Sequence, residues 1–313
     1  DRNKQIGELP NLLYSLLDKR NYLKLYEKTF VRAKAGRNVA PGLRLEFAAE
    51  FAERRALVNT SNYSLYKGAR DYTANAPIPV AASEPEQPFF DPNRTFQLEV
   101  GARIRFGETY SSYPDFRAYH RSKWPELTLR YTKALPGVFG SAMDYDLVQA
   151  RISQPDLSMG LFGYSAWNLG GGVFLRNKRT EFMDYYHPRG NQTILGKPSD
   201  YARGFFLLPY YEYSTNSTYG YAHWRHHFNG WVLGKLPLLR KLNWREALGF
   251  GIYHADRFAV QNDRPDATLP YWEASLGFYN IGFKIFRPLH IDVAVGFFGK
   301  DLHRTGVVFG VDL

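Results

Sequence analysis

Histidine and arginine side chains are concentrated in one short stretch of the sequence, Tyr221–Phe228. If this stretch forms a β-strand, His223, Arg225 and His227 share one face, because successive side chains of a strand point to opposite sides. The two histidines are then about 13 Å apart, since each residue advances the strand by roughly 3.3 Å. One metal ion cannot bridge that distance. We therefore predict a polar stripe facing an interior and no metal site.

A second group of polar residues lies in the segment 182–193, where Asp184, His187, Arg189 and Asn191 are mixed with three aromatic residues. Aromatic rings bury large areas when they pack, so this mixture suits a folded segment better than a solvated one. We predict that the segment folds inward and contacts charged walls. The alternative is an exposed loop tip.

Signatures of catalysis are missing from the sequence. It contains neither G-x-S-x-G nor H-E-x-x-H, and nothing marks one of its 8 histidines as a general base. The absence of Cys excludes thiolate zinc sites and cysteine nucleophiles. We expect no catalytic residue, no cofactor and no enzymatic activity, with a lipid or peptide hydrolase kept as an alternative.

The elements that must position these residues show a period of two. Apolar and polar side chains alternate through several segments of about ten residues, such as 43–52, 96–106 and 291–298. The apolar face is predicted to contact lipid through Leu45, Phe47, Val100, Ile104, Val293 and Phe309. The opposite face carries full charges, predicted to form a lumen charge network of Glu46, Glu50, Glu99, Arg103, Arg105 and Arg130.

The composition favours a membrane β-barrel. Aromatic residues make up 17% of the 313 residues, with 23 Tyr, 23 Phe and 27 Gly, while the mean hydropathy is −0.41. A barrel with an apolar outside, a polar lumen and aromatic girdles has such an average. Apolar runs are far shorter than the roughly 20 residues that a membrane-spanning helix needs. A soluble antiparallel sheet gives the same alternation and is the alternative.

The predicted fold is all-β: a closed antiparallel transmembrane β-barrel of about 12 strands, preceded by a short helix. The helical segment covers residues 1–20 and the barrel covers 21–313. A long strand is expected over 157–177, because Gly170–Gly172 gives no clear turn signal. The other strands are expected at about 27–37, 42–55, 94–106, 125–135, 144–154, 202–213, 218–232, 243–255, 270–281, 287–298 and 304–313.

The net charge of +10 does not indicate a nucleic-acid partner. Basic residues alternate with apolar ones instead of clustering, and no nucleic-acid-binding motif is present. A basic group at 235–245 lies near a predicted turn. Membrane lipids and lipopolysaccharide are the expected partners there, because their headgroups are anionic. A solvated turn is the alternative.

Five stretches, 42–64, 135–154, 182–193, 222–249 and 269–287, resemble one family in the expected order. The family is the C-terminal barrel, of unknown function, of the Bacteroidota outer-membrane proteins called carboxypeptidase-like regulatory domain-containing. The resemblance implies the outer membrane of a Gram-negative bacterium and a longer parent chain with an N-terminal immunoglobulin-like module. It supplies no known activity.

A more distant similarity links 222–249 to strands of outer-membrane assembly-factor and two-partner-secretion barrels. Those barrels carry a V-R-G-F/Y motif on an inward-folded loop. Here Arg189 and Gly190 match two of its positions.

Three classes of function follow from these features. The first is a non-enzymatic outer-membrane barrel that serves as an anchor and scaffold for other outer-membrane proteins. The second is a transport or assembly barrel with a pore or a lateral seam, and the third is the hydrolase named above. We expect the acidic face of 44–52 to lie beside the basic face of 97–105 and to occlude a narrow lumen. This favours the scaffold.

Overall fold

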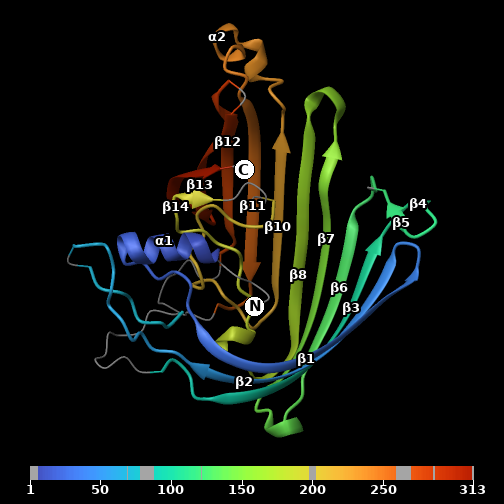
Figure 1. Ribbon diagram of the computed structural model, residues 1–313, viewed down its shortest axis with the longest axis vertical. Helices are drawn as coiled ribbons and strands as arrows, with labels where there is room; N and C mark the ends of the chain where they lie inside the picture. Colours follow the sequence, from blue (N-terminus) through green and yellow to red (C-terminus); the bar gives the residue numbers. More distant parts are fainter. Residues whose placement is uncertain are drawn as a thin grey trace.

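The structure, a computed structural model, describes residues 6–68, 70–77, 88–120, 122–196, 202–258, 269–284 and 286–311. These residues form one large, strongly curved β-sheet with a small helix beside it (Figure 1). The helices are α1 (Glu8–Asp18) and α2 (Pro237–Arg240), and short 3₁₀ turns include η1 (Val138–Gly140), η2 (Gly160–Phe162), η3 (Phe182–Asp184) and η5 (Leu233–Lys235).

Segments in which apolar and polar side chains alternate form long strands, and turns that contain glycine or proline connect many of them. The strands are β1 (Tyr26–Ala40), β2 (Leu43–Ala56), β3 (Asn93–Arg105), β4 (Tyr110–Ser112), β5 (Arg117–Tyr119), β6 (Glu126–Ala134), β7 (Asp144–Ser158), β8 (Tyr164–Arg179), β9 (Leu195–Gly196), β10 (Tyr219–His227), β11 (Arg245–Ala255), β12 (Tyr271–Phe283), β13 (Phe286–Phe298) and β14 (Asp301–Val311).

The main sheet has 12 strands in the order β1-β2-β3-β6-β7-β8-β10-β11-β12-β13-β14-β9. All strands except β9 form one antiparallel meander, so 12 less one gives eleven meander strands. The short β9 pairs in parallel with β14, and β4 and β5 form a separate hairpin. The all-β prediction is confirmed, and most of the described strands belong to one antiparallel sheet.

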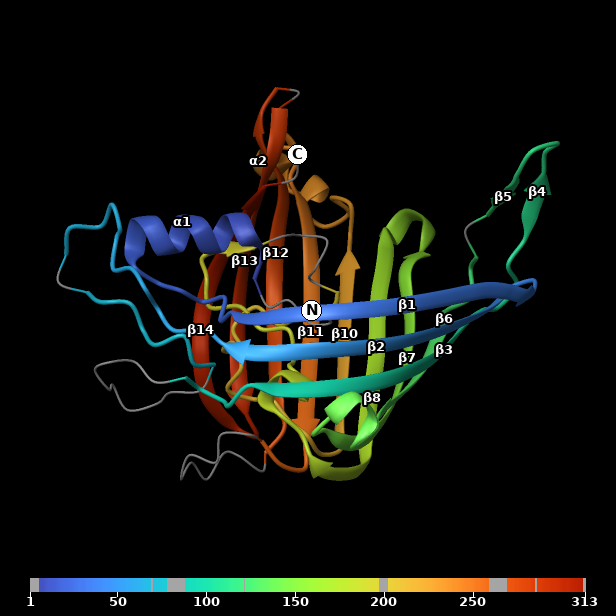
Figure 2. The ribbon, with the colours of Figure 1, turned by 60° about the horizontal axis from the view of Figure 1, so that its bottom comes forward.

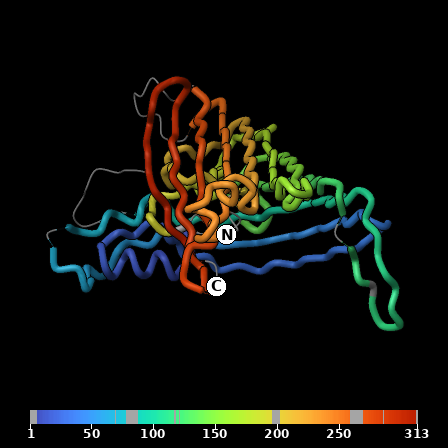
Figure 3. Tube along the Cα trace, turned by 90° about the horizontal axis from the view of Figure 1, so that it is seen from above, coloured from blue at the N-terminus to red at the C-terminus, as the bar shows by residue number. Residues whose placement is uncertain are grey.

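Closure of the sheet into a barrel is not confirmed. β1 lies at one end of the strand order and β14 with β9 at the other, and no ladder joins β1 to β14 among the described residues. The views from the side and from above show β1, β2 and β3 diverging from the steep strands β10 to β14 (Figures 2 and 3).

One predicted strand has a wrong start and another is wrong. β8 continues across Gly170–Gly172, as predicted, but it begins at Tyr164 and not at residue 157. Residues 157–158 end β7, and η2 follows, because Gly160 and Gly163 take positive φ angles of 63° and 95° that permit a tight turn. The stretch 202–213 forms no strand and lies in the interior of the curved sheet.

Large apolar side chains cover the outside of the sheet. Alternate residues of consecutive strands leave 39–49% of each side chain exposed, namely Leu45, Phe47, Val100, Leu129, Val148, Leu169, Trp224, Phe250, Leu276, Val293, Val307 and Phe309. Ile104 belongs to the same face and is half-buried. We call this set the outer apolar belt. Within the described ranges, no helix has the length and apolar character needed to cross a membrane.

The interior is packed with tyrosines and phenylalanines. Tyr145, Tyr219, Tyr253, Tyr271 and Phe298 extend inward from five different strands and are buried. These large aromatic rings form the apolar core, which lies on the concave side of the sheet.

Glycines make room for these rings. A Cβ added at Gly172 would lie 2.7–2.8 Å from the Tyr219 ring on the adjacent strand, and one at Gly296 would lie 2.6 Å from the Tyr271 hydroxyl. The glycine run in β8 therefore allows close packing of aromatic side chains on the inner face of the sheet.

Candidate functional site

The chain between β8 and β10 crosses the inside of the sheet (Figure 1). We call the described residues 180–196 and 202–218 the inward segment. Residues 180–196 are its near arm and residues 202–218 its far arm. Six of its aromatic and aliphatic side chains are buried in the two apolar core clusters, namely Phe205, Phe206, Leu207, Leu208, Tyr213 and, packed against them, Tyr186. The segment carries the predicted residues Asp184, His187, Arg189 and Asn191.

An ion pair fixes the first turn of the inward segment to β2. Arg54 donates from Nη1 and Nη2 to the two carboxylate oxygens of Asp184, at 2.9 and 2.7 Å. Only 4% and 3% of the two side chains are exposed. The Gln97 amide on β3 also donates to Asp184, at 3.2 Å. A bidentate pair with further donors satisfies charges that would otherwise be costly to bury.

Aromatic stacking fixes the next turn. The rings of Tyr186 and Tyr219 are parallel, with centroids 3.8 Å apart, and Tyr221 continues the stack at 5.9 Å from Tyr186. The backbone of Tyr186 exchanges hydrogen bonds of 2.8 and 2.9 Å with Thr215. Thus the two arms of the inward segment pair with each other and rest on β10.

A buried carboxylate on β12 fixes the far arm. Glu273 accepts hydrogen bonds from the backbone N–H groups of Phe206 and Leu207, at 2.6 and 3.2 Å, and from the Tyr271 hydroxyl at 2.8 Å. Leu207 also packs against Val308 of β14. These three donors satisfy the buried carboxyl group and join β12 to the inward segment.

Asn191 joins the two arms by side-chain and backbone contacts. Its side chain donates to the backbone oxygens of Thr193 and Phe206, and its backbone N–H donates to Leu208 at 2.8 Å. The Arg189 backbone oxygen accepts a hydrogen bond from Phe205 at 2.8 Å. The predicted residues Arg189 and Asn191 thus lie at the junction of the arms.

His187 lies between the ion pair and the stacked tyrosines. Ser214 Oγ lies 2.6 Å from Nδ1 of His187, within hydrogen-bond distance, and also donates to the Tyr211 carbonyl at 2.6 Å. Burial lowers the pKa of His187 from 6.5 to about 4, against the opposing effect of the Asp184 carboxylate. The Ser214 hydroxyl is fully buried.

The polar stripe on β10 lies on the inner face, as its alternation implies. His223 packs against Phe205, with ring centroids 4.4 Å apart, and His227 stacks on Tyr164. Arg225 is almost completely buried and pairs with Asp292 on β13. Its guanidinium lies 5.3 Å from the centre of the Phe206 ring. In the described ranges no group of three acidic or histidine side chains is arranged to hold a metal ion.

The predicted lumen charges divide into two groups. In the first group, Arg32 of β1 bridges Glu50 and Glu99, at 3.6 and 3.7 Å, and Arg130 pairs with Glu99 at 3.3 Å. Lys28 donates to Glu50 at 2.7 Å. This network extends over β1, β2, β3 and β6 on the inner face.

The second group does not make the predicted contacts. β2 and β3 are neighbours, but their register places Arg103 opposite Arg44 and not opposite a carboxylate. Arg103 and Arg105 pair with Glu126 of β6, and Glu46 is bound by Arg44. The arginine side chains are 40% and 46% exposed. They lie near the end of the strand, where Glu126 of β6 takes the place of the predicted partners on β2.

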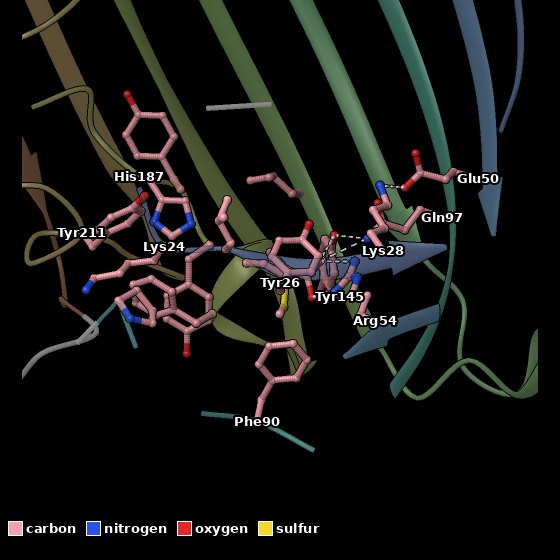
Figure 4. Close-up of a pocket in the computed structure, with 18 of the residues that line it drawn as sticks. Lys24, Tyr26, Lys28, Glu50, Arg54, Phe90, Gln97, Tyr145, His187 and Tyr211 are labelled. Carbon is pink, nitrogen blue, oxygen red and sulfur yellow. Dashed lines mark hydrogen bonds and ion pairs between the residues drawn. The ribbon is translucent and has the colours of Figure 1, made fainter. Parts of the chain in front are cut away.

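Between the charge network and the inward segment lies a cavity of about 470 Å³ (Figure 4). One end is lined by charged and amide side chains such as Lys28, Glu50 and Gln97, the middle by Tyr26 and Phe90, and the other end by His187 and Tyr211 of the inward segment. The cavity occupies the half of the sheet that the inward segment leaves uncovered.

A serine–histidine contact occurs outside the lumen. Ser165 donates to Nδ1 of His226 at 2.7 Å, while Nε2 of His226 contacts the carbonyl oxygen of Phe162 at 2.9 Å. Both side chains are buried, and Nε2 is bound to a carbonyl and not to a carboxylate. This pair fastens the η2 turn to β10.

Sequence reasoning missed Asp292, Tyr279 and Glu273, which hold Arg225 and the far arm. Acidic residues in the middle of strands are a signal that could have found the two carboxylates.

The V-R-G-F/Y similarity was assigned to Arg189 and Gly190. The order Arg-Gly-Phe also occurs at residues 203–205 of the same segment. Phe205 is buried there and Arg203 is exposed.

Comparison with solved structures finds OccK11 (OpdR) of Pseudomonas aeruginosa, at 9% sequence identity, with 90% of this chain and 68% of that chain covered. The TM-score of 0.31 is too low to support an argument about fold or function. No curated protein matches the chain.

Comparison with protein families gives a match over residues 1–278. The expected similarity to a domain of unknown function is confirmed, whereas the Bacteroidota source and the carboxypeptidase-like name stay predictions. The chain belongs to the family of unknown function (DUF5686), C-terminal domain.

Proposed function

We propose that this chain is the wall and plug of an outer-membrane β-barrel that acts as a non-enzymatic anchor and scaffold for other outer-membrane proteins. The observation that carries the proposal is the inward segment, which is bound to β2, β10 and β12 through buried polar contacts.

The outer apolar belt supports the membrane location. A contiguous band of exposed Leu, Val, Phe and Trp side chains runs over neighbouring strands, and a soluble protein rarely exposes such an area. The inner face carries charged and hydrogen-bonding groups. Apolar outside and polar inside is the arrangement of barrels that cross the outer membrane.

The tethers of the inward segment support a scaffold over an open pore. Arg54–Asp184 and Glu273 with its two amide donors lie on opposite sides of the concave interior, so the segment is held across it. Breaking one partner of a buried pair costs about 3–5 kcal/mol. We therefore expect the segment, held at both ends, to stay in the interior in nearly all molecules.

Single-channel recording in planar bilayers tests this function. We expect the wild-type protein to give no steady open current. The double variant Asp184→Asn, Glu273→Gln should give long open events, because both anchors of the inward segment are weakened. Steady wild-type conductance would contradict the scaffold. The variant Asp144→Asn is the matched control, since Asp144 pairs with the half-exposed Arg176 away from the plug.

A transport or assembly barrel is the second candidate. Two observations favour it. Among the described residues β1 and β14 do not pair with each other, and β9 covers β14 only at Phe309 and Gly310. The inward segment also carries the order Arg-Gly-Phe. Depletion of the protein in its native cell distinguishes the two. An assembly role predicts loss of many outer-membrane barrels from the membrane, whereas a scaffold role predicts loss only of the proteins that copurify with it.

A further inference from the structure

The two edge strands of the meander run in the same direction. Ten antiparallel pairings connect β1 to β14, and an even number of reversals restores the original direction. An antiparallel barrel closes only when its strand number is even. β1 and β14 therefore cannot close the sheet by pairing antiparallel with each other.

Both edge strands nevertheless expose large apolar side chains. Val307 of β14 and Val31 of β1 expose 42% and 75% of their side chains. The parallel strand β9 covers β14 only at Phe309 and Gly310. Each unpaired backbone N–H or C=O in hydrocarbon costs several kcal/mol, so strand edges do not stay open in lipid. Further strands must cover these edges when the sheet is in a membrane.

A second copy of the chain cannot supply them. Copies inserted in one membrane share one orientation, so β1 and β14 of every copy point the same way. Pairing between copies would be parallel at each edge. The antiparallel rule of membrane barrels instead demands an odd number of added strands, with the first and the last antiparallel to β14 and β1.

The position of the chain just before β1 indicates where these strands originate. The α1 helix lies at the gap beside the β14 edge (Figures 2 and 3). The Tyr14 hydroxyl accepts from the N–H of Ile194 at 3.0 Å, and the carbonyl of Ile194 accepts from Phe309 of β14 at 2.7 Å. The polypeptide that leads into β1 is therefore linked through Ile194 to the opposite edge of the sheet.

We propose that an odd number of transmembrane strands from the polypeptide N-terminal to residue 1 fills the gap between β1 and β14 in the full-length protein. The family is defined as a C-terminal domain, and consecutive strands of a meander are neighbours. The strand that precedes α1 then pairs with the free edge of β1. This inference rests on the proposed membrane barrel.

Photo-crosslinking of the full-length protein in native outer membranes tests it. A benzophenone side chain is placed at Val31 on β1, at Val307 on β14, or at Val293 on β13 as the control with strands on both sides. We expect Val31 and Val307 to crosslink to peptides that precede residue 1 of the same polypeptide. Val293 should crosslink only to β12, β14 and phospholipid.

Other products would overturn the proposal. These are a crosslink that joins β1 to β14, an edge crosslink to a second copy or another protein, and edge crosslinks to lipid alone. The control separates this failure from that of the proposed function. If Val293 does not crosslink to phospholipid, the membrane barrel itself is wrong. If it does and the edges give no N-terminal peptide, only the added strands are wrong.

Discussion

Arg54 on β2 and Asp184 on the inward segment form a bidentate ion pair although 130 residues separate them in the chain. Neither side chain reaches solvent to more than 4%. The pair therefore joins a strand of the sheet to the segment that packs inside its curve.

Replacing Asp184 by Asn should release this end of the inward segment. Arg54 is left as a buried cation with only neutral acceptors, and we expect a loss of about 3–5 kcal/mol in the free energy of unfolding. Thermal melting in detergent and limited proteolysis of 180–196 measure the two effects. Asp144→Asn, which breaks a half-exposed pair with Arg176, should cost less than about 1 kcal/mol. Equal losses in both variants would contradict a special role for Arg54–Asp184.

Lowering the pH should loosen the same segment through His187. Its pKa is about 4 in the folded protein and near 6.5 when unfolded, so between these values the unfolded state binds more protons. The stabilisation is complete above pH 6.5 and is lost as the pH falls to about 4. Hydrogen exchange of 180–196 at pH 7 and pH 4.5 tests this. His187→Asn should remove most of the difference that carboxyl protonation does not explain.

Much of the sheet could be predicted from alternation alone. The register of β2 and β3 places Phe47 opposite Val100 on the outside and Glu50 opposite Gln97 on the inside, as the period of two requires. The stripe of His223 and Arg225 also lies on the predicted face. A strict period of two encodes which face is buried, so these features are local properties of the sequence.

Contacts between distant strands could not be predicted. Alternation does not specify how far one strand slides along the next, and this offset put Arg103 opposite Arg44 in place of a glutamate. Nor does it say whether an odd or even number of strands forms. The partners of Arg225 and of the inward segment depend on which strands meet across the interior, which only the folded sheet determines.

The charge network should be more sensitive on β2 than at the end of β3. Glu50 is bound by Lys28 and Arg32 and is mostly buried, whereas Arg103 and Arg105 are 40% and 46% exposed. We expect Glu50→Gln to lower the melting temperature more than the double variant Arg103→Ala, Arg105→Ala. The double variant should cost below about 1 kcal/mol. The reverse order of melting temperatures would mean that the exposed arginines brace the sheet.

Gly190 should tolerate no side chain. A Cβ there would overlap the backbone carbonyl of Leu208 on the other arm of the inward segment, and backbone cannot rotate away. We expect Gly190→Ala to cost about 1–3 kcal/mol, as overpacking does elsewhere, and to expose the segment to protease. Gly234→Ala is the control, because an added Cβ there meets no atom within 4 Å. Similar melting of both variants would show that the arms can separate freely.

Charge on the outer apolar belt should be costly only at the centre of the membrane. Val293 is 44% exposed in the middle of β13, so an arginine there would lie in hydrocarbon. Arg at the midplane of a barrel costs about 2–4 kcal/mol, and near the interfaces about 0–1 kcal/mol. Val39, next to the turn between β1 and β2, provides the rim comparison at 49% exposure. Folding titrations into liposomes should therefore show a large loss for Val293→Arg and a small one for Val39→Arg. If Val293→Arg folded as well as the wild type while remaining in the bilayer, the assignment of this face of β13 to lipid would be wrong.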